Sequence, residues 1–324
     1  MRTTAIFFVY LLGCLVLAAL LTYPLMQTGW IHEAPQRVMG RLAQAFILLG
    51  LWPFLRSLRL NSRAALGYGI DRKGFLQSVG RGWIAGILIL LVMVAALMVL
   101  HVRVLDLPSH GLAGYVLGKA LTALIGGLLI GLLEETFFRG ALFTALRRRN
   151  GLRSAVLWSA LLYALLHFMK PAALPDGVPL DWNATWGMFM HVFVGLFQWR
   201  HLDSLTALFL VGVFLALVRE RTGHIGWCIG LHAGWVFVIQ VSRRLTDGDD
   251  GAMLAFLAGD YDGVIGWLAA AWIGLLALLF WHISSRVAIQ GQHRAAEIAD
   301  DRAARAAPHG DAGGTRTQRG SDRP

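Results

Sequence analysis

Long apolar runs separated by short polar segments dominate the hydrophobic pattern of this chain. The hydrocarbon core of a bilayer is about 30 Å thick, and an α-helix crosses it in about 20 apolar residues. By hydropathy the pattern predicts spans near residues 5–25, 42–57, 82–102, 113–146, 153–169, 203–219, 223–241 and 263–283. It therefore predicts an all-α polytopic membrane protein, a bundle of about eight transmembrane helices.

One stretch, residues 170–202, departs from this pattern. It starts as a proline-rich segment, "KPAALPDGVPLDW", and then becomes rich in tryptophan and phenylalanine. The apolar part, residues 186–199, is shorter than a membrane span requires. Aromatic side chains of this kind are enriched at the membrane–water interface, so we predict an interfacial or re-entrant helix here rather than a crossing.

The composition supports a membrane solvent and changes the interpretation of the charge. Of 324 residues, 56% are hydrophobic and 15% are charged, whereas soluble domains are about 45–50% apolar and about 25% charged. The net charge of +10 is carried mainly by short basic runs between apolar segments. Cytoplasmic loops have this character under the positive-inside rule, so the charge predicts contact with the lipid bilayer and no nucleic-acid partner.

The same rule predicts the orientation of the chain. If residues 186–199 do not cross, the basic connection at 58–81, the basic turns at 147–149 and 219–224, and the arginine-rich tail all lie on one side. We therefore expect an integral protein of a bacterial-type plasma (inner) membrane, with both the N-terminus and the C-terminus in the cytoplasm.

Three charges interrupt the fourth apolar run, in the sequence "LLEETFFRG". On a helix, Glu135 and Arg139 are four residues apart and lie on one face, where they can pair. Glu134 is turned about 100° away and has no such partner. Ionisable groups inside membrane spans are expensive and usually functional, so Glu134 is a candidate for chemistry. The alternative is a buried ion pair that fixes helix packing, with Glu134 at the water interface.

Helix lengths place two histidines at the depth of Glu134. Glu134 lies 16 residues before a turn near Asn150, and His167 lies 17 residues after it. At about 1.5 Å per residue, an antiparallel hairpin places both roughly 25 Å from the turn. His232 follows the next turn, near Thr222, by about 15 Å of helix. One carboxylate and two imidazoles can therefore meet inside the bundle, which is an acid–base constellation.

These residues resemble the motifs of the CPBP family, the CAAX-protease and bacteriocin-processing or abortive-infection proteins. The family's first motif, EExxxR, matches Glu134 to Arg139. Its second motif, an aromatic residue followed four later by histidine, matches Tyr163 and His167. Its third motif is histidine followed four later by asparagine or a similar polar residue, and here His232 is followed by Val236. The resemblance covers about residues 115–240.

The resemblance implies an intramembrane endopeptidase, similar to the type II CAAX prenyl endopeptidases, that acts on a membrane-associated protein or peptide. In the family's glutamate-type mechanism, the residues matching Glu134 and His167 activate a water molecule. The residue matching His232, together with the motif asparagine, stabilises the oxyanion, and Val236 cannot donate that hydrogen bond. Glu135 and Arg139 would position the helix, which gives five candidate catalytic-site residues: Glu134, His167, His232, Glu135 and Arg139.

Two alternatives concern the chemistry and the function class. Glu134, His167 and His232 could ligate Zn²⁺ with one open position, although we favour no cofactor because no self-sufficient zinc motif such as HExxH is present. A catalytically inactive membrane scaffold or immunity-type binding protein would account for Val236. A proton-coupled transporter is a further alternative, which the lack of a visible internal repeat disfavours.

These interpretations divide the chain into four regions. Residues 1–112 hold the first transmembrane helices and a basic cytoplasmic loop, and residues 113–245 hold the CPBP-like catalytic core. Residues 246–284 are the last loop and span, and residues 285–324 are expected to be a basic, disordered cytoplasmic tail.

Overall fold

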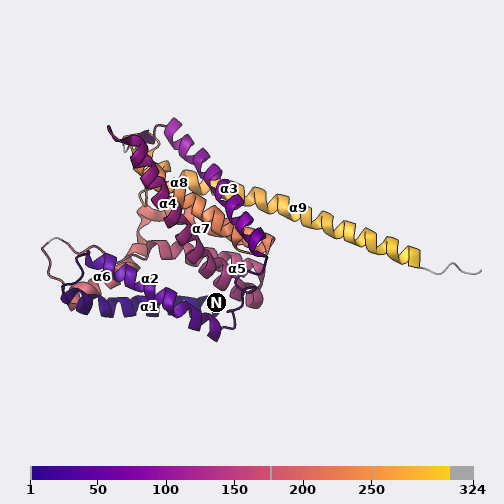
Figure 1. The fold of residues 1–324 in the computed structure, drawn as a ribbon, viewed down its shortest axis with the longest axis horizontal. Helices are drawn as coiled ribbons and strands as arrows, with labels where there is room; N and C mark the ends of the chain where they lie inside the picture. The colour runs from indigo at the N-terminus through magenta and orange to yellow at the C-terminus, as the bar shows by residue number, and fades with distance from the viewer. Residues whose placement is uncertain (1, 176, 250, 307–324) are drawn as a thin grey trace, which may run out of the picture. The chain divides into compact units, whose positions relative to one another are not determined.

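The computed structural model describes residues 2–175, 177–249 and 251–306, and most of them are helical (Figure 1). The chain forms two compact units, Met1–Leu279 and Phe280–Pro324. The helices are α1 Arg2–Gln27, α2 Pro35–Ser57, α3 Arg72–Val99, α4 Leu112–Glu135, the π-helix η1 Thr136–Leu142, α5 Phe143–Phe168, α6 Trp182–Val194, α7 Leu202–Thr222, α8 Gly226–Leu245 and α9 Trp267–Ala306. Three single 3₁₀ turns are η2 Gly195–Phe197, η3 Trp199–His201 and η4 Ala255–Leu257.

Membrane-length helices confirm the predicted all-α polytopic membrane fold. Within the described residues, six helical stretches are long and apolar enough to cross a bilayer: Arg2–Gln27, Pro35–Ser57, Arg72–Val99, Leu112–Phe168, Trp199–Thr222 and Trp267–Arg286. The fourth has 57 residues, and its helix is interrupted at Gly151. The φ of this residue is 80°, a value that glycine adopts at little cost because it has no Cβ. The fourth stretch therefore contains two of the predicted spans, joined at the turn expected near Asn150.

Two predicted elements fall outside those six stretches. The span predicted at 223–241 is the 20-residue helix α8, which lies among the other helices. The segment predicted not to cross forms α6, whose 13 residues are too short for a 30 Å hydrocarbon core. The orientation and the identity of the membrane stay predictions.

Glycines bring α3 and α4 into close contact with α8. A Cβ added to Gly127 of α4 would lie 2.8 Å from the Ala233 carbonyl oxygen of α8. A Cβ on Gly234 of α8 would lie 2.5 Å from the Trp83 carbonyl oxygen of α3. In a membrane, where helices gain little from hydrophobic burial, small residues let backbones pack tightly. This packing carries His232 of α8 to the end of α4.

The first two helices pack against α6 rather than against this glycine-rich group. Their shared core contains Leu15, Ala18, Ala19, Met39, Ala43, Met188, Phe189 and Val192. In Figure 1, α1 and α2 lie side by side, with α6 next to them. The structure thus gives α6 a packed apolar face, while Trp182 and Trp186 remain about half exposed.

A two-stranded ribbon joins the ends of α3 and α8. Strand β1, Arg103–Leu105, pairs antiparallel with β2, Thr246–Gly248. Arg103 is buried, and its guanidinium donates to the Thr246 hydroxyl at 2.7 Å and to the Thr246 carbonyl at 2.6 Å. These bonds hold together two segments that are far apart in the chain.

The final helix covers part of the expected tail. α9 runs to Ala306, and the rest of that region, residues 307–324, lies outside the described residues. The four-region division of the chain stays a prediction.

Candidate active site

The end of α4 and the start of η1 carry the charged motif. Glu134 and Glu135 are the last two residues of α4, and Arg139 lies within the seven-residue π-helix η1. A π turn changes the angular spacing of side chains and is frequent at functional sites. Here η1 packs against the connection before α3, where a Cβ on Gly140 would lie 2.9 Å from the Leu66 carbonyl oxygen.

We call the fully buried part of the site, formed by Glu135, Arg139 and the groups that they contact, the closed side. Both side chains are 0% exposed, and Arg139 Nη1 donates to Glu135 Oε1 at 3.0 Å. Arg139 Nη2 donates to the Gly212 carbonyl of α7 at 3.2 Å. The same Glu135 oxygen lies 2.8 Å from Nδ1 of His232. The expected Glu135–Arg139 pair therefore also holds one of the two candidate histidines.

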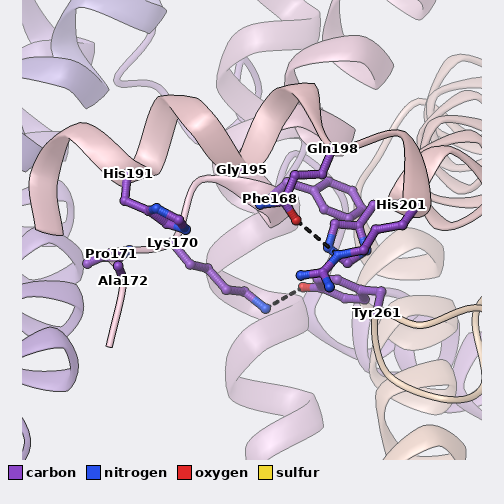
Figure 2. A pocket seen from close by; sticks show the side chains of 10 residues that line it. Phe168, Lys170, Pro171, Ala172, His191, Gly195, Gln198, His201 and Tyr261 are labelled. Atoms are coloured by element: carbon purple, nitrogen blue, oxygen red, sulfur yellow. Dashed lines mark hydrogen bonds between the residues drawn. The ribbon is translucent and has the colours of Figure 1, made fainter. Parts of the chain in front are cut away.

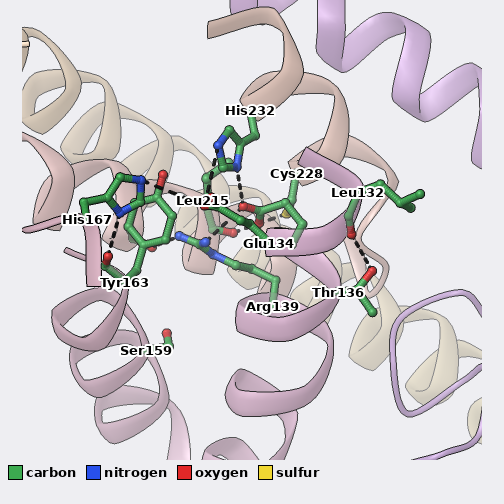
Figure 3. Close-up of polar contacts among 12 residues, drawn as sticks. Leu132, Glu134, Thr136, Arg139, Ser159, Tyr163, His167, Leu215, Cys228 and His232 are labelled. Carbon is green, nitrogen blue, oxygen red and sulfur yellow. Dashed lines mark hydrogen bonds and ion pairs between the residues drawn. The ribbon is translucent and has the colours of Figure 1, made fainter. Parts of the chain in front are cut away.

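We call the partly exposed part of the site, formed by Glu134, His167 and the groups that they contact, the open side. The Glu134 side chain is 32% exposed and that of His167 is 22% exposed. Glu134 Oε2 lies 3.9 Å from Nε2 of His167 and 3.8 Å from Nε2 of His232 (Figure 3). These distances are too long for direct hydrogen bonds, and this oxygen has no hydrogen-bond partner within the described part of the chain.

The contacts of the two imidazoles determine which nitrogen faces Glu134. His167 Nδ1 lies 2.8 Å from the Tyr163 carbonyl oxygen, and His232 Nδ1 lies 2.8 Å from a Glu135 carboxylate oxygen. A carbonyl or an ionised carboxylate only accepts, so each Nδ1 carries the hydrogen. In its neutral form, each histidine thus turns an unprotonated Nε2 toward Glu134.

Tyr163 contacts more of the site than its place in the second motif indicated. Its ring lies 4.6 Å from the His167 ring and 6.0 Å from the His232 ring. The Arg139 guanidinium lies 4.6 Å from the centre of the same ring. An aromatic face next to a desolvated cation is stabilising. The ring thus contacts Arg139 on the closed side and His167 on the open side.

Tyr261 is a further residue at the site, and sequence reasoning did not find it. It lies in the loop before α9, outside the expected catalytic core, and its hydroxyl donates to the His167 carbonyl oxygen at 3.2 Å. It also accepts a 2.8 Å hydrogen bond from Lys170. The sequence carries no periodicity or motif that predicts such a long-range loop contact.

Val236 follows His232 by one helical turn, as the third motif predicts for asparagine, and it is half-buried. Its aliphatic side chain supplies no hydrogen-bond donor. Among the residues that the structure describes, no group of three or more His, Cys, Asp or Glu side chains is arranged to hold a metal ion.

Comparison with known families places this site in a named group. Residues 116–238 match the family described as "Type II CAAX prenyl endopeptidase Rce1-like". That segment includes all three motifs and confirms the resemblance drawn from them. The match supports, at the level of the family, a CAAX-type protease of the membrane, a family whose substrates are membrane-associated proteins or peptides. Comparisons with curated proteins and with solved structures give no match.

Proposed function

We propose that this chain, a CAAX-type protease at the level of its family, cleaves a membrane-associated protein or peptide with a water molecule activated by Glu134 and His167. One observation carries the proposal: an otherwise unpartnered oxygen of Glu134 faces the Nε2 atoms of two histidines at 3.9 Å and 3.8 Å. These separations leave room for a water molecule that donates one hydrogen to Glu134 and the other to Nε2 of His167.

The first step is the attack of water on the scissile carbonyl. Glu134 takes one proton from the water while the water oxygen forms a bond to the carbonyl carbon. The π electrons of the carbonyl group move to the carbonyl oxygen, which becomes the oxyanion. Nε2 of His167 accepts a hydrogen bond from the second water proton and thereby orients the attack. As the tetrahedral intermediate collapses, the C–N bond breaks, and the proton held by Glu134 passes to the leaving nitrogen.

His232 faces the developing negative charge in this scheme. Its Nδ1 hydrogen is engaged by Glu135, so Nε2 donates to an oxyanion only when the ring carries a second proton. The Glu135 carboxylate at 2.8 Å stabilises that imidazolium. Glu135 and Arg139 are therefore positioning residues, which act on the substrate through His232.

A zinc mechanism fits the same three side chains less well. Zinc bonds of about 2.0–2.1 Å at tetrahedral angles place ligand atoms roughly 3.3 Å apart. The Glu134 oxygen is 3.9 Å and 3.8 Å from the two histidine nitrogens, and no step here uses a metal. We expect cleavage to persist after prolonged dialysis against EDTA, measured on purified protein. Loss of cleavage with EDTA, restored by Zn²⁺, would contradict the metal-free mechanism.

Comparative membrane proteomics tests the function even though the substrate is unidentified. Cells with the wild-type chain are compared with cells that carry Glu134→Ala, and we expect one or more membrane-associated proteins to remain uncleaved in the variant. Glu33→Ala is the control, because Glu33 is a partly exposed carboxylate whose ion pairs, among the described residues, are those with Arg37 and Arg41. Full processing in the Glu134→Ala cells would end the proposal.

An inactive binding protein is the second candidate function. The observation that favours it is Val236, since an apolar side chain stands where the family has a hydrogen-bond donor. In that case, the wild-type and Glu134→Ala proteomes would be identical, and both proteins would still bind the same partner in a pull-down from membranes.

A further inference from the structure

Two pockets with basic linings lie toward the two ends of α5. The first, of about 260 Å³, is lined by Phe168 and Tyr261 (Figure 2) and adjoins the candidate active site, because Tyr261 donates to the His167 carbonyl at 3.2 Å. The second, of about 190 Å³, is lined by the first turns of α1, the residues at the end of α2 and the start of α5. At about 1.5 Å per residue, the helix from Gly151 to His167 is roughly 25 Å long. The second pocket is therefore separate from the reacting groups.

Three arginines surround this second pocket, which we call the arginine pocket: Arg59 after α2, and Arg148 and Arg149 near the start of α5. All three are exposed, and none of the lining residues is Asp or Glu. Among the described residues, none of the three forms a salt bridge. The neighbouring Arg147 is different, because it bonds the Glu220 carboxylate at 2.9 Å and 3.1 Å. Like charges around one cavity repel one another, and a bound anion offsets that repulsion.

The backbone of Arg59 has a conformation that glycine adopts more readily. Its φ is 56°, in the left-handed region, where a Cβ is crowded by the backbone. Its N–H donates to the Arg56 carbonyl at 3.1 Å, and the N–H of Leu60 donates to the Leu55 carbonyl at 2.9 Å. This is the Schellman ending of a helix, in which glycine is the usual residue. The chain instead places a cation there, at a cost in backbone strain, which indicates a role for the side chain.

The rest of the lining suits a small anion with an apolar body. It is apolar except for Thr3, which is 5% exposed. Thr3 lies in the first turn of α1, where the backbone N–H groups have no helical partner and the helix dipole favours negative charge. A water molecule takes up about 30 Å³ in the liquid, so the pocket has room for roughly six non-hydrogen atoms, enough for a phosphate group. Guanidinium groups bind phosphate oxygens through paired, charge-assisted hydrogen bonds.

The position of the pocket indicates that the phosphate belongs to a lipid. α1 begins at Arg2, α2 ends at Ser57 and the long fourth stretch turns at Gly151, so the ends of three membrane-length stretches meet here. Helices of this length end where the hydrocarbon gives way to the headgroups. Val9 of α1 and Trp52 of α2, within two helical turns of the pocket, are 64% and 57% exposed. A phospholipid can place its phosphate among the arginines and its acyl chains along such apolar side chains.

We propose that the arginine pocket binds the phosphate of an anionic phospholipid through Arg59, Arg148 and Arg149. The bound lipid links the end of α2 to the start of α5 and so stabilises the folded chain, since a ligand that binds only the folded state raises its stability. The site is independent of the proposed cleavage, and its test does not require activity. Free phosphate offers the same oxygen atoms, and the experiment separates it from a lipid.

The probe is dioleoyl phosphatidylglycerol, titrated into the full-length wild-type protein in dodecylmaltoside micelles. Native mass spectrometry measures binding, and thermal denaturation measures stability. We expect this lipid to bind at least about tenfold tighter than dioleoyl phosphatidylcholine, whose headgroup has no net charge, and to raise the unfolding temperature until the site is saturated. Arg148→Gln and Arg149→Gln should each lower the affinity at least about fivefold, whereas Arg148→Lys should lower it less because the charge remains.

Arg59→Gly separates binding from folding. Glycine adopts a φ of 56° without strain, so the unfolding temperature in the absence of anionic lipid should stay the same or rise. The affinity for phosphatidylglycerol should nevertheless fall at least about fivefold. Arg153→Gln is the matched control, because Arg153 is an exposed cation of α5 that does not line the pocket. This variant should bind the lipid within about twofold of wild type.

Four outcomes would overturn the proposal. Equal affinity for the two lipids would show that the charge of the headgroup is not recognised, and full affinity in Arg59→Gly would remove the strained arginine from the site. A loss in Arg153→Gln as large as that in Arg148→Gln would show diffuse attraction to a basic surface. Stabilisation by inorganic phosphate that equals that by the lipid, and is lost in Arg148→Gln, would assign the pocket to a soluble anion. Binding of a short polyglutamate peptide without binding of phosphatidylglycerol would likewise replace the lipid with an acidic protein partner.

Discussion

The open side and the closed side of the site differ although their glutamates are adjacent in the chain. Glu135 on the closed side is 0% exposed and is bonded to Arg139 and His232. Glu134 on the open side is 32% exposed, and one of its oxygens has no hydrogen-bond partner in the described residues. The difference shows that helical spacing determines which of two identical side chains has a structural role. Glu135 has an arginine four residues later and pairs with it, whereas Glu134 has none.

Energetics support this division. A buried ion pair is stable only when its geometry offsets the cost of removing two charges from water, and the loss of one partner strands the other. A carboxylate that must exchange a proton cannot be held in such a pair. We therefore expect changes on the open side to alter chemistry alone, and changes on the closed side to alter folding as well.

Glu134→Gln should produce the largest effect on activity. Glutamine keeps the size of the side chain but cannot take a proton from water, so kcat/KM should fall by about 10²–10⁴. The free energy of unfolding should change by less than about 0.5 kcal/mol, because the side chain is partly exposed and its two histidine contacts, at 3.9 Å and 3.8 Å, are long. Cleavage of an identified substrate and denaturation in micelles measure the two quantities.

Either quantity could contradict the comparison. Activity within threefold of wild type in Glu134→Gln would show that the open side is not where the proton is transferred. A large loss of stability would show that Glu134 is structural like its neighbour.

Glu135→Gln should have the largest effect on stability. It leaves the Arg139 guanidinium, which is 0% exposed, without its carboxylate. We expect the free energy of unfolding to fall by about 3–5 kcal/mol, and activity to fall because His232 loses the partner of its Nδ1. The double variant Glu135→Gln, Arg139→Met should recover part of the stability but not the activity, since no buried charge is then stranded.

The measurement is a double-mutant cycle by denaturation, with Arg139→Met as the second single variant. If the two single changes add without coupling, the ion pair does not hold the closed side. If the double variant also regains full activity, Glu135 does not position His232.

The sequence predicted the elements of the site better than their contacts. Span lengths and the turn at Asn150 sufficed to expect Glu134, His167 and His232 at one depth, because helix rise per residue is nearly constant. The i+4 rule sufficed for the Glu135–Arg139 pair. These predictions needed only local geometry and the number of residues between turns.

Contacts that depend on how helices rotate or on where loops fold were beyond the sequence. The bond from His232 to Glu135 depends on the rotation of α8 about its axis, which the glycine contacts with α3 and α4 determine. The π-helix at Thr136–Leu142 has no sequence signal that we recognise. Tyr261 reaches His167 across 94 residues of chain, and neither periodicity nor a motif relates the two.

Val236→Asn should have a smaller effect on activity and stability than the two glutamate variants. It tests whether His232, which contacts both sides of the site, stabilises the oxyanion. A new amide at this position could donate to the oxyanion, a bond that typically contributes about 2.7–4 kcal/mol to an acyl-transfer transition state. We therefore expect kcat to stay unchanged or to rise. Stability should fall by about 1–3 kcal/mol, because an amide replaces a packed, half-buried valine and can lack a partner without substrate.

Cleavage by Val236→Asn where the wild type cleaves nothing would support the inactive binding protein as the natural state. A folded Val236→Asn protein that loses an activity present in the wild type would place the oxyanion elsewhere in the site.

Tyr163→Phe should have the smallest effect, and it tests the boundary between the two sides. Tyr163 acts through its backbone carbonyl, which bonds His167, and through its ring face, which contacts Arg139. Phenylalanine keeps both contacts, so activity should stay within about threefold and stability within about 0.5 kcal/mol. Tyr163→Leu is the matched variant: it removes the aromatic face and should cost about 0.5–2 kcal/mol more than Tyr163→Phe. If Tyr163→Phe instead reduces kcat by a hundredfold with normal folding, the hydroxyl takes part in the reaction. Tyrosine would then supply the donor that Val236 lacks, and the ring would belong to the open side.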